Sequence, residues 1–408
     1  MIELCKKYLP ALACAGLFST PLLAAPPGAV YGNEAEIMAE EMGEVLVTVS
    51  ADVNRDGVVT DTEMSRGPAS LESGPLMLFN CDDDDGDGQP DHMDNKVNGP
   101  EDMKDLAPIR VTLVVQDESA LESFEFEVDN ALPAYVRFFV EKDGELVRWD
   151  TSDPLPLVEQ PDGKTRVANL FAEARYFADG TWNGRINLTA RAKTAEGMNL
   201  TSSQSLRVAP WIMLAGLEKG EVVYVREYPD QNDEFLASLR EIVPAAGAKL
   251  EIIPGDAPYS AHNIWLQDTM EIGYTQAAGD PMNVVLKANR NKPLDNFAKD
   301  QLLGPDYGWF ESGQFREEFG AGNGGTSWID WFGNLEVTPP LKGYPNGRVF
   351  YGVTSDGASL NPDVVRMINA QEIQGPAIPI NVEFLLIKHV DEIINFVPTG
   401  DQIGRAHV

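Results

Sequence analysis

The chain has 408 residues, 43% hydrophobic and 9% aromatic, a composition that supports folded cores and excludes a globally disordered protein. Its 64 acidic residues against 31 Lys and Arg give a net charge of −33, which repels phosphate backbones and excludes a nucleic-acid partner. Three cysteines are too few for a disulfide framework in a chain of this length, which predicts about two or three domains.

Residues 1–25 are predicted to be an export signal. Lys6 and Lys7 precede a mostly apolar run, Tyr8–Ala25, that ends in small residues. The run is short and contains two prolines, which argues against a permanent membrane helix. A lipidated Cys14 is the weaker alternative, because the segment before it is too short. We therefore expect an exported protein, secreted or periplasmic, with no membrane partner after signal cleavage.

The segment from Glu44 to about Val208 reads as β-structure. Alternation of side chains over residues 45–50 predicts a strand with one buried face. Further β-rich runs are Ile109–Gln116, Phe124–Val128, Tyr135–Val140 and Arg185–Ala192. Asp-Gly turn signals such as Asp143-Gly144 lie between several of them. Short strands at this spacing predict a β-sandwich.

The pattern changes after Pro210. Glu221–Arg226 reads as a strand, an apolar stripe from Phe235 predicts a helix that ends at Pro244, and Lys249–Ile253 reads as a second strand. A strand–helix–strand unit indicates that the second half is α/β.

Two segments have the composition of calcium sites. Asp52-Val-Asn54-Arg-Asp56-Gly57, followed by Glu63, matches a calcium-loop pattern at every constrained position. A strand precedes it and Gly67-Pro68 follows too soon for a full exit helix, so we expect an EF-like loop on a β-domain. The alternative is a solvated Asp/Gly turn.

The second segment runs from Asn80 to Asp105 and holds ten acidic residues and two lysines after Cys81. This density of carboxylates opposes folding unless cations neutralise it, so the sequence predicts two or more Ca²⁺ ions. Its predicted ligands include Asp94. The alternative is an exposed acidic run.

Two short clusters in the second half carry titratable groups. His389-Val-Asp391 would place both side chains on one face if it were a strand, with one group for proton transfer and the other for a cation. The other cluster runs from Trp265 through Asp268 to Glu271. Each pattern alone is more often structural than catalytic.

Together the motifs resemble the calcium-dependent protein-arginine deiminase (peptidyl-arginine deiminase) family. The segments that carry the resemblance are Val208–Met213, Trp265–Tyr274, Gly304–Gly308, Phe332–Pro340 and His389–Pro398, in the family's order. The segment Asn80–Asp105 also resembles the family's middle, calcium-binding domain. The resemblance covers about Val45 to Gln402.

The resemblance implies an immunoglobulin-like β-sandwich, residues 26–208, followed by an incomplete pentein-type α/β-propeller catalytic domain, residues 209–402. In that family a cysteine thiolate attacks the guanidinium carbon, ammonia leaves, and water hydrolyses the thiouronium. Asp268 and Asp391 take the positions that grip the guanidinium, and His389 takes that of the acid/base. Trp265 would stack on the substrate's alkyl stem, and Arg290 would contact the substrate.

The resemblance also implies calcium ligands. Those beside the active site would be Gln267, Glu271, Phe332, Leu335 and Glu336, with the Phe and Leu acting through backbone carbonyls. Those of the middle domain would be Asn80, Asp82, Asp84, Asp91, Asp102, Asp105 and Asp306.

The family's nucleophilic cysteine lies far beyond His389, and the sequence stops at Val408. Residues 403–408 depart abruptly from the family and equal a translated sequencing adapter, so we expect an assembly artefact on a truncated gene. The alternative is a natural divergent C-terminus.

The sequence therefore predicts an exported enzyme that converts peptidyl arginine to peptidyl citrulline and ammonia with Ca²⁺, acting on an arginine-containing protein or peptide. We expect the 408-residue chain to be inactive by itself. The family's animal members are cytoplasmic. Two alternatives stay open: a non-catalytic, calcium-binding extracellular β-sandwich, and a binder of free arginine or agmatine.

Overall fold

The computed structural model describes residues 44–60, 63, 74–216, 220–259, 263–277, 281–316, 328–397 and 405–407. The predicted export signal lies outside these residues. No helix in the described ranges has the length and apolar character needed to cross a membrane.

The first half of the described chain folds into two β-sheets. The larger has the strand order β1–β3–β8–β5–β6, with β7 paired to β8. Its strands are β1 (Val45–Ala51), β3 (Ala107–Val115), β5 (Val136–Lys142), β6 (Glu145–Trp149), β7 (Val158–Glu159) and β8 (Thr165–Ala174). The smaller has the order β2–β10–β9–β4. Its strands are β2 (Leu76–Met77), β4 (Leu121–Asp129), β9 (Arg185–Thr194) and β10 (Asn199–Val208).

The two sheets pack against each other through alternating apolar side chains. Val45, Val47 and Val49 of β1 are buried, as the alternation predicted, and β1 contacts β9 and β10 of the other sheet. Asp143 and Gly144 join β5 to β6, both at positive φ (55° and 84°), which confirms this predicted hairpin.

The second half is built from smaller sheets flanked by helices. One sheet has the order β11–β14–β15–β16, a parallel pair is formed by β12 and β13, and another sheet has the order β17–β18–β19. The strands are β11 (Ile212–Met213), β12 (Val222–Arg226), β13 (Lys249–Ile253), β14 (Met270–Thr275), β15 (Met282–Lys287), β16 (Tyr307–Glu311), β17 (Leu335–Val337), β18 (Val349–Val353), β19 (Ile378–Asn381), β20 (Asn395–Val397) and β21 (Arg405–His407).

The helices are short except for α3. The α-helices are α2 (Pro100–Lys104), α3 (Asp233–Ala245), α4 (Phe297–Gln301) and α5 (Pro362–Ala370). The 3₁₀ turns are η1 (Asp91–Met93), η2 (Glu118–Ala120), η3 (Gln267–Thr269), η4 (Pro293–Asn296), η5 (Trp328–Asp330), η6 (Phe332–Asn334) and η7 (Val390–Glu392). The parallel β12–α3–β13 unit confirms the predicted strand–helix–strand, although Pro244 lies inside the last turn instead of ending the helix before it.

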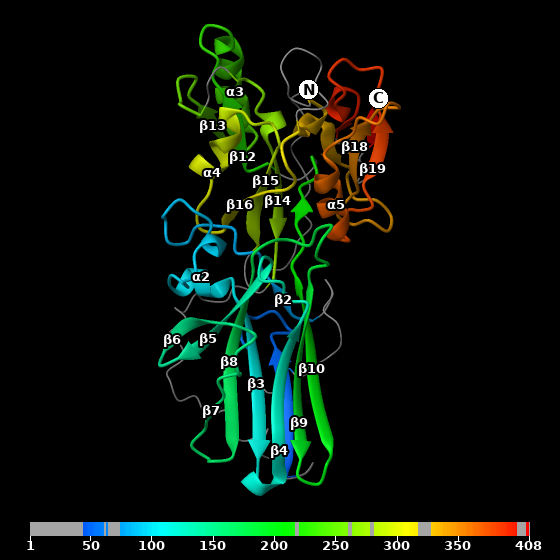
Figure 1. Ribbon diagram of the computed structural model, residues 1–408. Helices are drawn as coiled ribbons and strands as arrows, with labels where there is room; N and C mark the ends of the chain where they lie inside the picture. Colours follow the sequence, from blue (N-terminus) through cyan, green and yellow to red (C-terminus); the bar gives the residue numbers. More distant parts are fainter. Residues whose placement is uncertain are drawn as a thin grey trace.

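Figure 1 shows the long strands β3, β4, β8, β9 and β10 at one end of an elongated molecule and the helix-flanked sheets at the other. The structure is therefore mostly β-sheet in several sheets, and no sheet closes on itself within the described residues. The order of a β-rich half and then an α/β half agrees with the sequence. The immunoglobulin-like and propeller details stay predictions.

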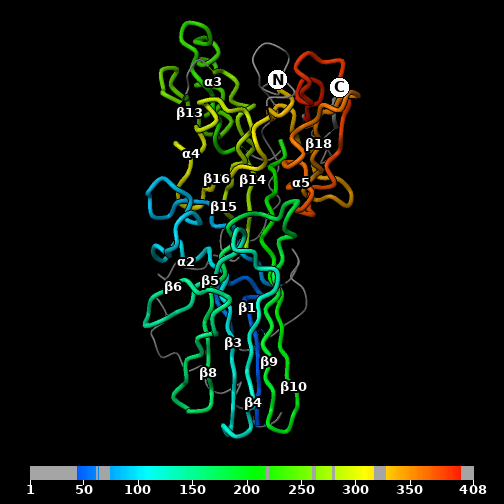
Figure 2. Tube along the Cα trace, viewed as in Figure 1, coloured from blue at the N-terminus to red at the C-terminus, as the bar shows by residue number. Residues whose placement is uncertain are grey.

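The two halves share one hydrophobic core. It includes Trp211 at the start of the second half and Phe310 of β16, whose ring centroids lie 5.9 Å apart, together with Phe177 from the loop after β8. We call Asn80–Asp105 the acidic segment, and the trace in Figure 2 shows the part of it that precedes α2 beside β16. Trp309 N–H donates to the Cys81 carbonyl at 3.0 Å, so main-chain bonds also cross the junction.

Gln371, after α5, fixes this junction through its side chain. Its Oε1 accepts from Trp211 N–H at 3.0 Å, and its Nε2 donates to the carbonyls of Ala178 (2.7 Å) and Met367 (2.8 Å). All of these bonds are buried, so each partner depends on this one amide.

We predict that Gln371→Leu lowers the free energy of unfolding by roughly 2–4 kcal/mol, because it leaves buried donors and acceptors unpaired at about 1–3 kcal/mol each. Urea unfolding followed by circular dichroism measures the change. Gln301→Leu, on the exposed end of α4, is the control and should change stability by less than about 0.5 kcal/mol. Equal losses of stability in the two variants would contradict the structural role assigned to the Gln371 side chain.

Candidate functional site

Asp268, His389 and Asp391 meet around Gly333. His389 Nδ1 lies 3.4 Å from Asp268 Oδ1 and 4.0 Å from Asp391 Oδ1. The Gly333 N–H donates to Asp268 Oδ1 at 3.2 Å. A Cβ at Gly333 would lie 2.5 Å from His389 Nδ1, 2.8 Å from Asp391 Oδ2 and 2.9 Å from Asp268 Oδ1. Only a residue without a side chain fits between these three groups, and no sequence motif singled out Gly333.

Three short 3₁₀ turns bring these side chains together. Asp268 lies in η3, directly before β14, and Gly333 lies in η6, directly before β17. The expectation that His389 and Asp391 share a strand is wrong: His389 directly precedes η7, and its N–H donates to Glu392 Oε1 at 3.1 Å. The 3₁₀ turn still leaves the two side chains adjacent, because it curls the backbone instead of extending it.

The histidine is oriented by a backbone carbonyl. His389 Nε2 lies 2.7 Å from the Trp328 carbonyl oxygen, which can only accept, so Nε2 must carry a hydrogen. Nδ1 therefore faces Asp268 and Asp391. A proton on Nδ1 would lie between the ring and two carboxylates, the geometry that a proton-transfer group needs.

The two carboxylates are held in an environment that opposes their charge. Burial raises the pKa of Asp268, and the neighbouring His389 and Arg290 partly offset this rise. Burial also raises the pKa of the more exposed Asp391, and the charge of Asp268 adds to it. A guanidinium placed beside both would favour their ionised forms. The pair can therefore bind a cation.

Trp265 and Arg290, both near Asp268, differ in exposure. The Trp265 side chain is exposed, and its contact with a substrate stays a prediction. Arg290 is fully buried: it donates to Asp295 Oδ1 at 2.7 Å and to the Trp265 carbonyl at 2.8 Å, and its guanidinium lies 4.9 Å from the Trp331 ring centroid. Its Nη1 is 3.9 Å from Asp268 Oδ2. In this structure Arg290 contacts Asp268, Asp295 and Trp265, and its contact with a substrate stays a prediction.

A second group of carboxylates lies beside the first. Glu271 is buried, its Oε1 has no hydrogen-bond partner, and burial together with Glu336, Asp391 and Asp268 raises its pKa well above the usual range. Burial and Asp391 raise the pKa of Glu336 to about 7. Phe332 and Leu335 are buried on the adjoining turn and strand, whereas Gln267 is exposed. The orphaned buried carboxylate fits a divalent cation.

The acidic segment forms a separate cluster at the junction of the two halves. Carboxylate oxygens of Asp82, Asp84 and Asp105 lie within 4.8 Å of one another. Burial and mutual repulsion raise the pKa of Asp82 to about 7, of Asp84 to about 6 and of Asp105 to about 9. Asp82 Oδ1 and Asn80 Oδ1 are buried without a hydrogen-bond partner, and Asp82 Oδ2 accepts from Asp306 N–H at 2.9 Å. Oxygens without donors fit a Ca²⁺ ligand set.

The other predicted ligands of this segment lie around the cluster. Asp102 Oδ1 accepts from Asn80 Nδ2 at 2.8 Å. Asp91 Oδ2 accepts from Asp84 N–H at 2.9 Å, and burial raises the pKa of Asp91 to about 8. Asp94 lies farther out, where its carboxylate accepts from Lys96 N–H at 2.8 Å.

The Asp52 loop is closed by its own backbone. Asp52 accepts from the N–H groups of Arg55 (2.6 Å), Asp56 (3.2 Å) and Gly57 (2.8 Å), and Asn54 Oδ1 accepts from Asp56 N–H at 2.9 Å. Glu63 Oε2 accepts from Thr60 N–H at 2.7 Å and so folds back over the loop. The side chains of Asn54 and Asp56 are exposed.

A loop with the same hydrogen bonds follows in the acidic segment. The sequence predicted calcium binding by this segment but did not include Asp83, Asp85 or Asp87 among the ligands. Asp83 accepts from the N–H groups of Gly86 (2.9 Å), Asp87 (3.1 Å) and Gly88 (2.8 Å). Gly57 and Gly88 share a φ of 82°. Carboxylates of Asp83, Asp85 and Asp91 lie close enough to hold a metal ion. The signal was the spacing Asp83-x-Asp85-x-Asp87-Gly88, which repeats that of residues 52–57.

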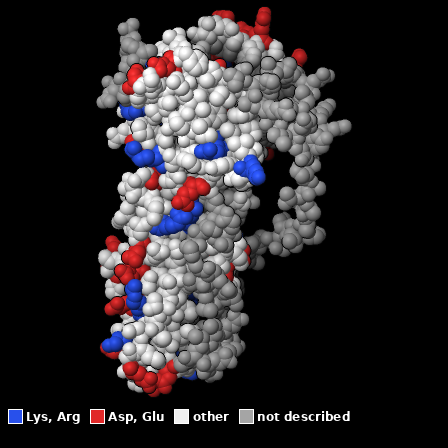
Figure 3. Space-filling view, turned by 90° about the vertical axis from the view of Figure 1, so that its right-hand side faces the viewer, with Lys and Arg blue, Asp and Glu red and all other residues white. Residues whose placement is uncertain are grey.

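Charged side chains are unevenly distributed on the surface. On the face drawn in Figure 3, acidic side chains gather at the foot of the strand-rich half, while Lys and Arg lie mainly around the middle. The described part of this face thus shows no extended basic surface.

We predict that Gly333→Ala lowers the free energy of unfolding by about 1–3 kcal/mol, because the added methyl overlaps His389 and both aspartates. Gly216→Ala is the matched control, since a Cβ there meets nothing within 4 Å. Chemical denaturation measures both. A Gly333→Ala chain as stable as the control would contradict the described geometry.

We also predict that, in chelator, the free energy of unfolding falls as pH rises from about 4 to 9. The folded pKa values of Asp84, Asp82 and Asp105 are raised to about 6, 7 and 9. Each of these carboxyl groups therefore contributes its full stabilisation below its unfolded pKa, and this stabilisation is lost as the pH rises through its folded pKa. Saturating Ca²⁺ should abolish this decrease in the free energy of unfolding, because the ion stabilises the ionised carboxylates.

Denaturant titrations at pH 5 and pH 8, in EGTA and in Ca²⁺, measure this dependence. Asp105→Asn should flatten it in EGTA, because that carboxyl no longer titrates. An identical pH dependence in all of these samples would contradict the prediction.

Comparison with known proteins places these residues in a family. A family model for protein-arginine deiminase (PAD) matches residues 199–406, about half of the chain. Protein-arginine deiminase type-4 of Mus musculus is 30% identical over 386 residues, covering 88% of this chain and 56% of that protein. Type-1 of Mus musculus (30%) and type-3 of Homo sapiens (29%) match with the same coverage, so the chain spans about half the length of these relatives. The chain belongs to the protein-arginine deiminase family.

Proposed function

We propose that the protein catalyses the calcium-dependent hydrolysis of peptidyl arginine to peptidyl citrulline and ammonia, and that this chain contributes the guanidinium-binding and acid/base groups. The observation that carries the proposal is the convergence of Asp268, Asp391 and His389 around Gly333. The substrate would be an arginine-containing protein or peptide.

Binding would depend on paired charges. Asp268 and Asp391 would each accept N–H bonds from the substrate guanidinium, a geometry that favours planar, bidentate recognition. The Gly333 N–H holds Asp268 in place at 3.2 Å. The exposed ring of Trp265 would cover the apolar stem of the arginine and exclude water.

His389 would move the proton. With Nε2 donating to the Trp328 carbonyl, Nδ1 is the atom that faces the substrate-binding carboxylates and can exchange a proton with a reacting group. The thiolate of the family reaction is not supplied by Cys81. That thiol is fully buried, and burial and the nearby Asp82 raise its pKa well above the usual range, the opposite of what a nucleophile needs.

Calcium would be held at three places within the described residues. Glu271 and Glu336, with Gln267 and the carbonyls of Phe332 and Leu335, adjoin Asp268; the acidic segment and the Asp52 loop provide the other two. When bound there, Ca²⁺ supplies the positive charge that keeps these buried carboxylates ionised. The ligands assigned to the acidic segment are Asn80, Asp82, Asp84, Asp91, Asp94, Asp102, Asp105 and Asp306, and those of the first loop are Asp52, Asn54 and Asp56.

We further propose the domain arrangement that the family implies. Residues 26–208 would form an immunoglobulin-like calcium-binding domain, residues 209–402 part of a pentein-type propeller, and residues 1–25 an export signal. For the first two of these, support comes from the two packed sheets of the first half and from the small sheets of the second, each of which contains a parallel pair.

A second candidate function is the binding of arginine without turnover. The burial of Cys81 favours it, because the described residues then offer a guanidinium site without a thiolate. The two functions differ only in whether ammonia is released.

We predict that this chain binds benzoyl-arginine amide in Ca²⁺ and that Asp268→Asn weakens the binding by about 2–5 kcal/mol, because one charge facing the guanidinium is lost at a desolvated site. Isothermal titration calorimetry in Ca²⁺ and in EGTA measures the affinity. Asp300→Asn, on the exposed end of α4, is the control, and benzoyl-lysine amide is the control ligand.

Binding that persists in both EGTA and Asp268→Asn would refute the proposed site. Ammonia release by this chain, measured in the same samples, would reveal a nucleophile other than Cys81 if it survives Cys81→Ser.

A further inference from the structure

A buried ion pair lies directly behind the acidic segment. The Arg137 side chain of β5 and the Glu173 side chain of β8 are 2% and 1% exposed. Arg137 donates to Glu173 from both Nε and Nη2, the second bond at 2.9 Å. A pair of this kind rarely raises stability by itself, because desolvation offsets the attraction. Its other contacts point to a different role.

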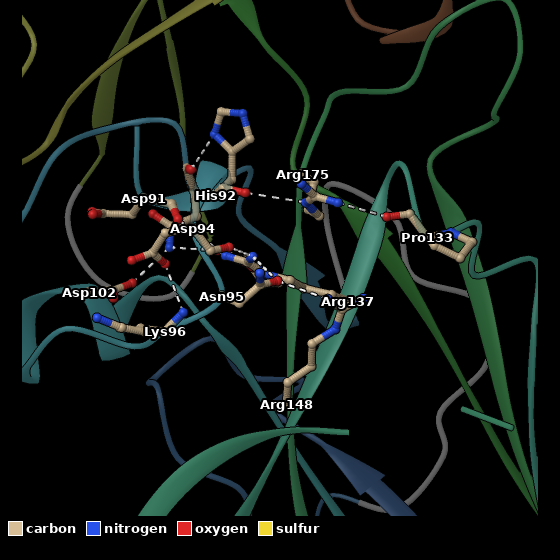
Figure 4. Close-up of polar contacts among 12 residues, drawn as sticks. Asp91, His92, Asp94, Asn95, Lys96, Asp102, Pro133, Arg137, Arg148 and Arg175 are labelled. Atoms are coloured by element: carbon tan, nitrogen blue, oxygen red, sulfur yellow. Dashed lines mark hydrogen bonds and ion pairs between the residues drawn. The ribbon is translucent and has the colours of Figure 1, made fainter. Parts of the chain in front are cut away.

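Arg137 holds the acidic segment by its main chain. Its Nη2 donates to the Asp91 carbonyl at 3.2 Å, and its Nη1 donates to the Asp94 carbonyl and to Asn95 Oδ1 at 3.4 Å. Figure 4 shows the Arg137 guanidinium reaching the segment beside Asp94 and Asn95. The guanidinium thus fixes both ends of turn η1 and adds a permanent positive charge behind the carboxylates.

Glu173 determines which way the Asn80 amide points. Asn80 Nδ2 donates to Glu173 Oε1 at 3.0 Å and to Asp102 Oδ1 at 2.8 Å. Both partners are carboxylate oxygens, which accept, so the nitrogen and not the oxygen must face them. The Asn80 Oδ1 is then turned the other way, where it is buried and has no hydrogen-bond partner.

We propose that Arg137 and Glu173 are a positioning pair that presents the Asn80 oxygen to the Ca²⁺ ion of the acidic segment. This rests on the calcium binding of the proposed function. The unpartnered oxygen is the observation that points to the ion, and the two acceptors behind the amide explain its orientation. Groups that orient a ligand in this way change metal affinity by about 10- to 100-fold when they are altered.

The test is calcium titration of the full chain by isothermal calorimetry. The background carries Asp56→Ala, which removes a predicted calcium ligand from the Asp52 loop. Glu173→Gln keeps the shape but replaces one carboxylate oxygen by an NH₂ group. Arg137 Nε then loses its acceptor if the NH₂ group replaces Oε2, and both Arg137 Nη2 and Asn80 Nδ2 lose theirs if it replaces Oε1. We expect calcium binding to the acidic segment to weaken at least about tenfold. Unfolding in EGTA, measured in parallel, separates this effect from loss of fold.

Arg148→Lys is the matched control. Arg148 of β6 reaches the same segment, donating to Asn95 Oδ1 at 2.9 Å, but contacts neither Glu173 nor Asn80. The calcium affinity of the Arg148→Lys chain should stay within about twofold of that of the parent chain. If Glu173→Gln does not fold, Arg137→Met with Glu173→Leu removes the pair without an unpaired charge and should show the same weakening.

The outcomes are distinct. Weakened binding in a folded Glu173→Gln or double variant, with the control unchanged, supports the positioning role. Unchanged affinity in the folded variants overturns it while leaving the proposed function intact. No calcium binding by the parent chain overturns both.

Discussion

Carboxylates buried within a few ångströms of one another must either take up protons or share a cation. This constraint acts at Asp82, Asp84 and Asp105, whose carboxylate oxygens lie within 4.8 Å of one another. At a second place, burial and the charge of Glu336 raise the pKa of Glu271. At both places, buried oxygens lack any hydrogen-bond donor from the protein. A proton on the carboxylates or a bound cation can offset the free-energy cost of burying such atoms without partners.

The first cluster also lies where the two halves join. Asp82 accepts from Asp306 N–H, and Trp309 N–H donates to the Cys81 carbonyl, so the acidic segment is tied to β16. β16 pairs with β15 and β15 with β14, which begins next to Asp268. The charge state of the acidic segment therefore bears on the sheet next to Asp268, where we propose that the guanidinium binds. Neutralising the carboxylates of the acidic segment and positioning Asp268 are therefore coupled through this sheet.

Local patterns predicted the elements that depend on local physics. Alternation predicted the buried face of β1, Asp143-Gly144 predicted the β5–β6 hairpin, and apolar spacing predicted α3 between two parallel strands. The residues His389, Asp391 and Asp268 were found from motifs, and the structure brings them together. What the sequence could not show was long-range: the 3₁₀ geometry at His389, the space at Gly333, and the pairing of Arg137 with Glu173 across two strands. Each depends on contacts between segments far apart in the chain, and no periodicity records them.

The most direct test is a calorimetric calcium titration of the full chain at pH 7.5 in two buffers that differ in ionisation enthalpy. If buried carboxyl groups hold protons until a cation replaces them, binding must release protons, and the observed heat must depend on the buffer. We predict calcium binding with net proton release. Calcium binding whose heat is the same in both buffers, or no binding at all, would contradict the central role of these carboxylates.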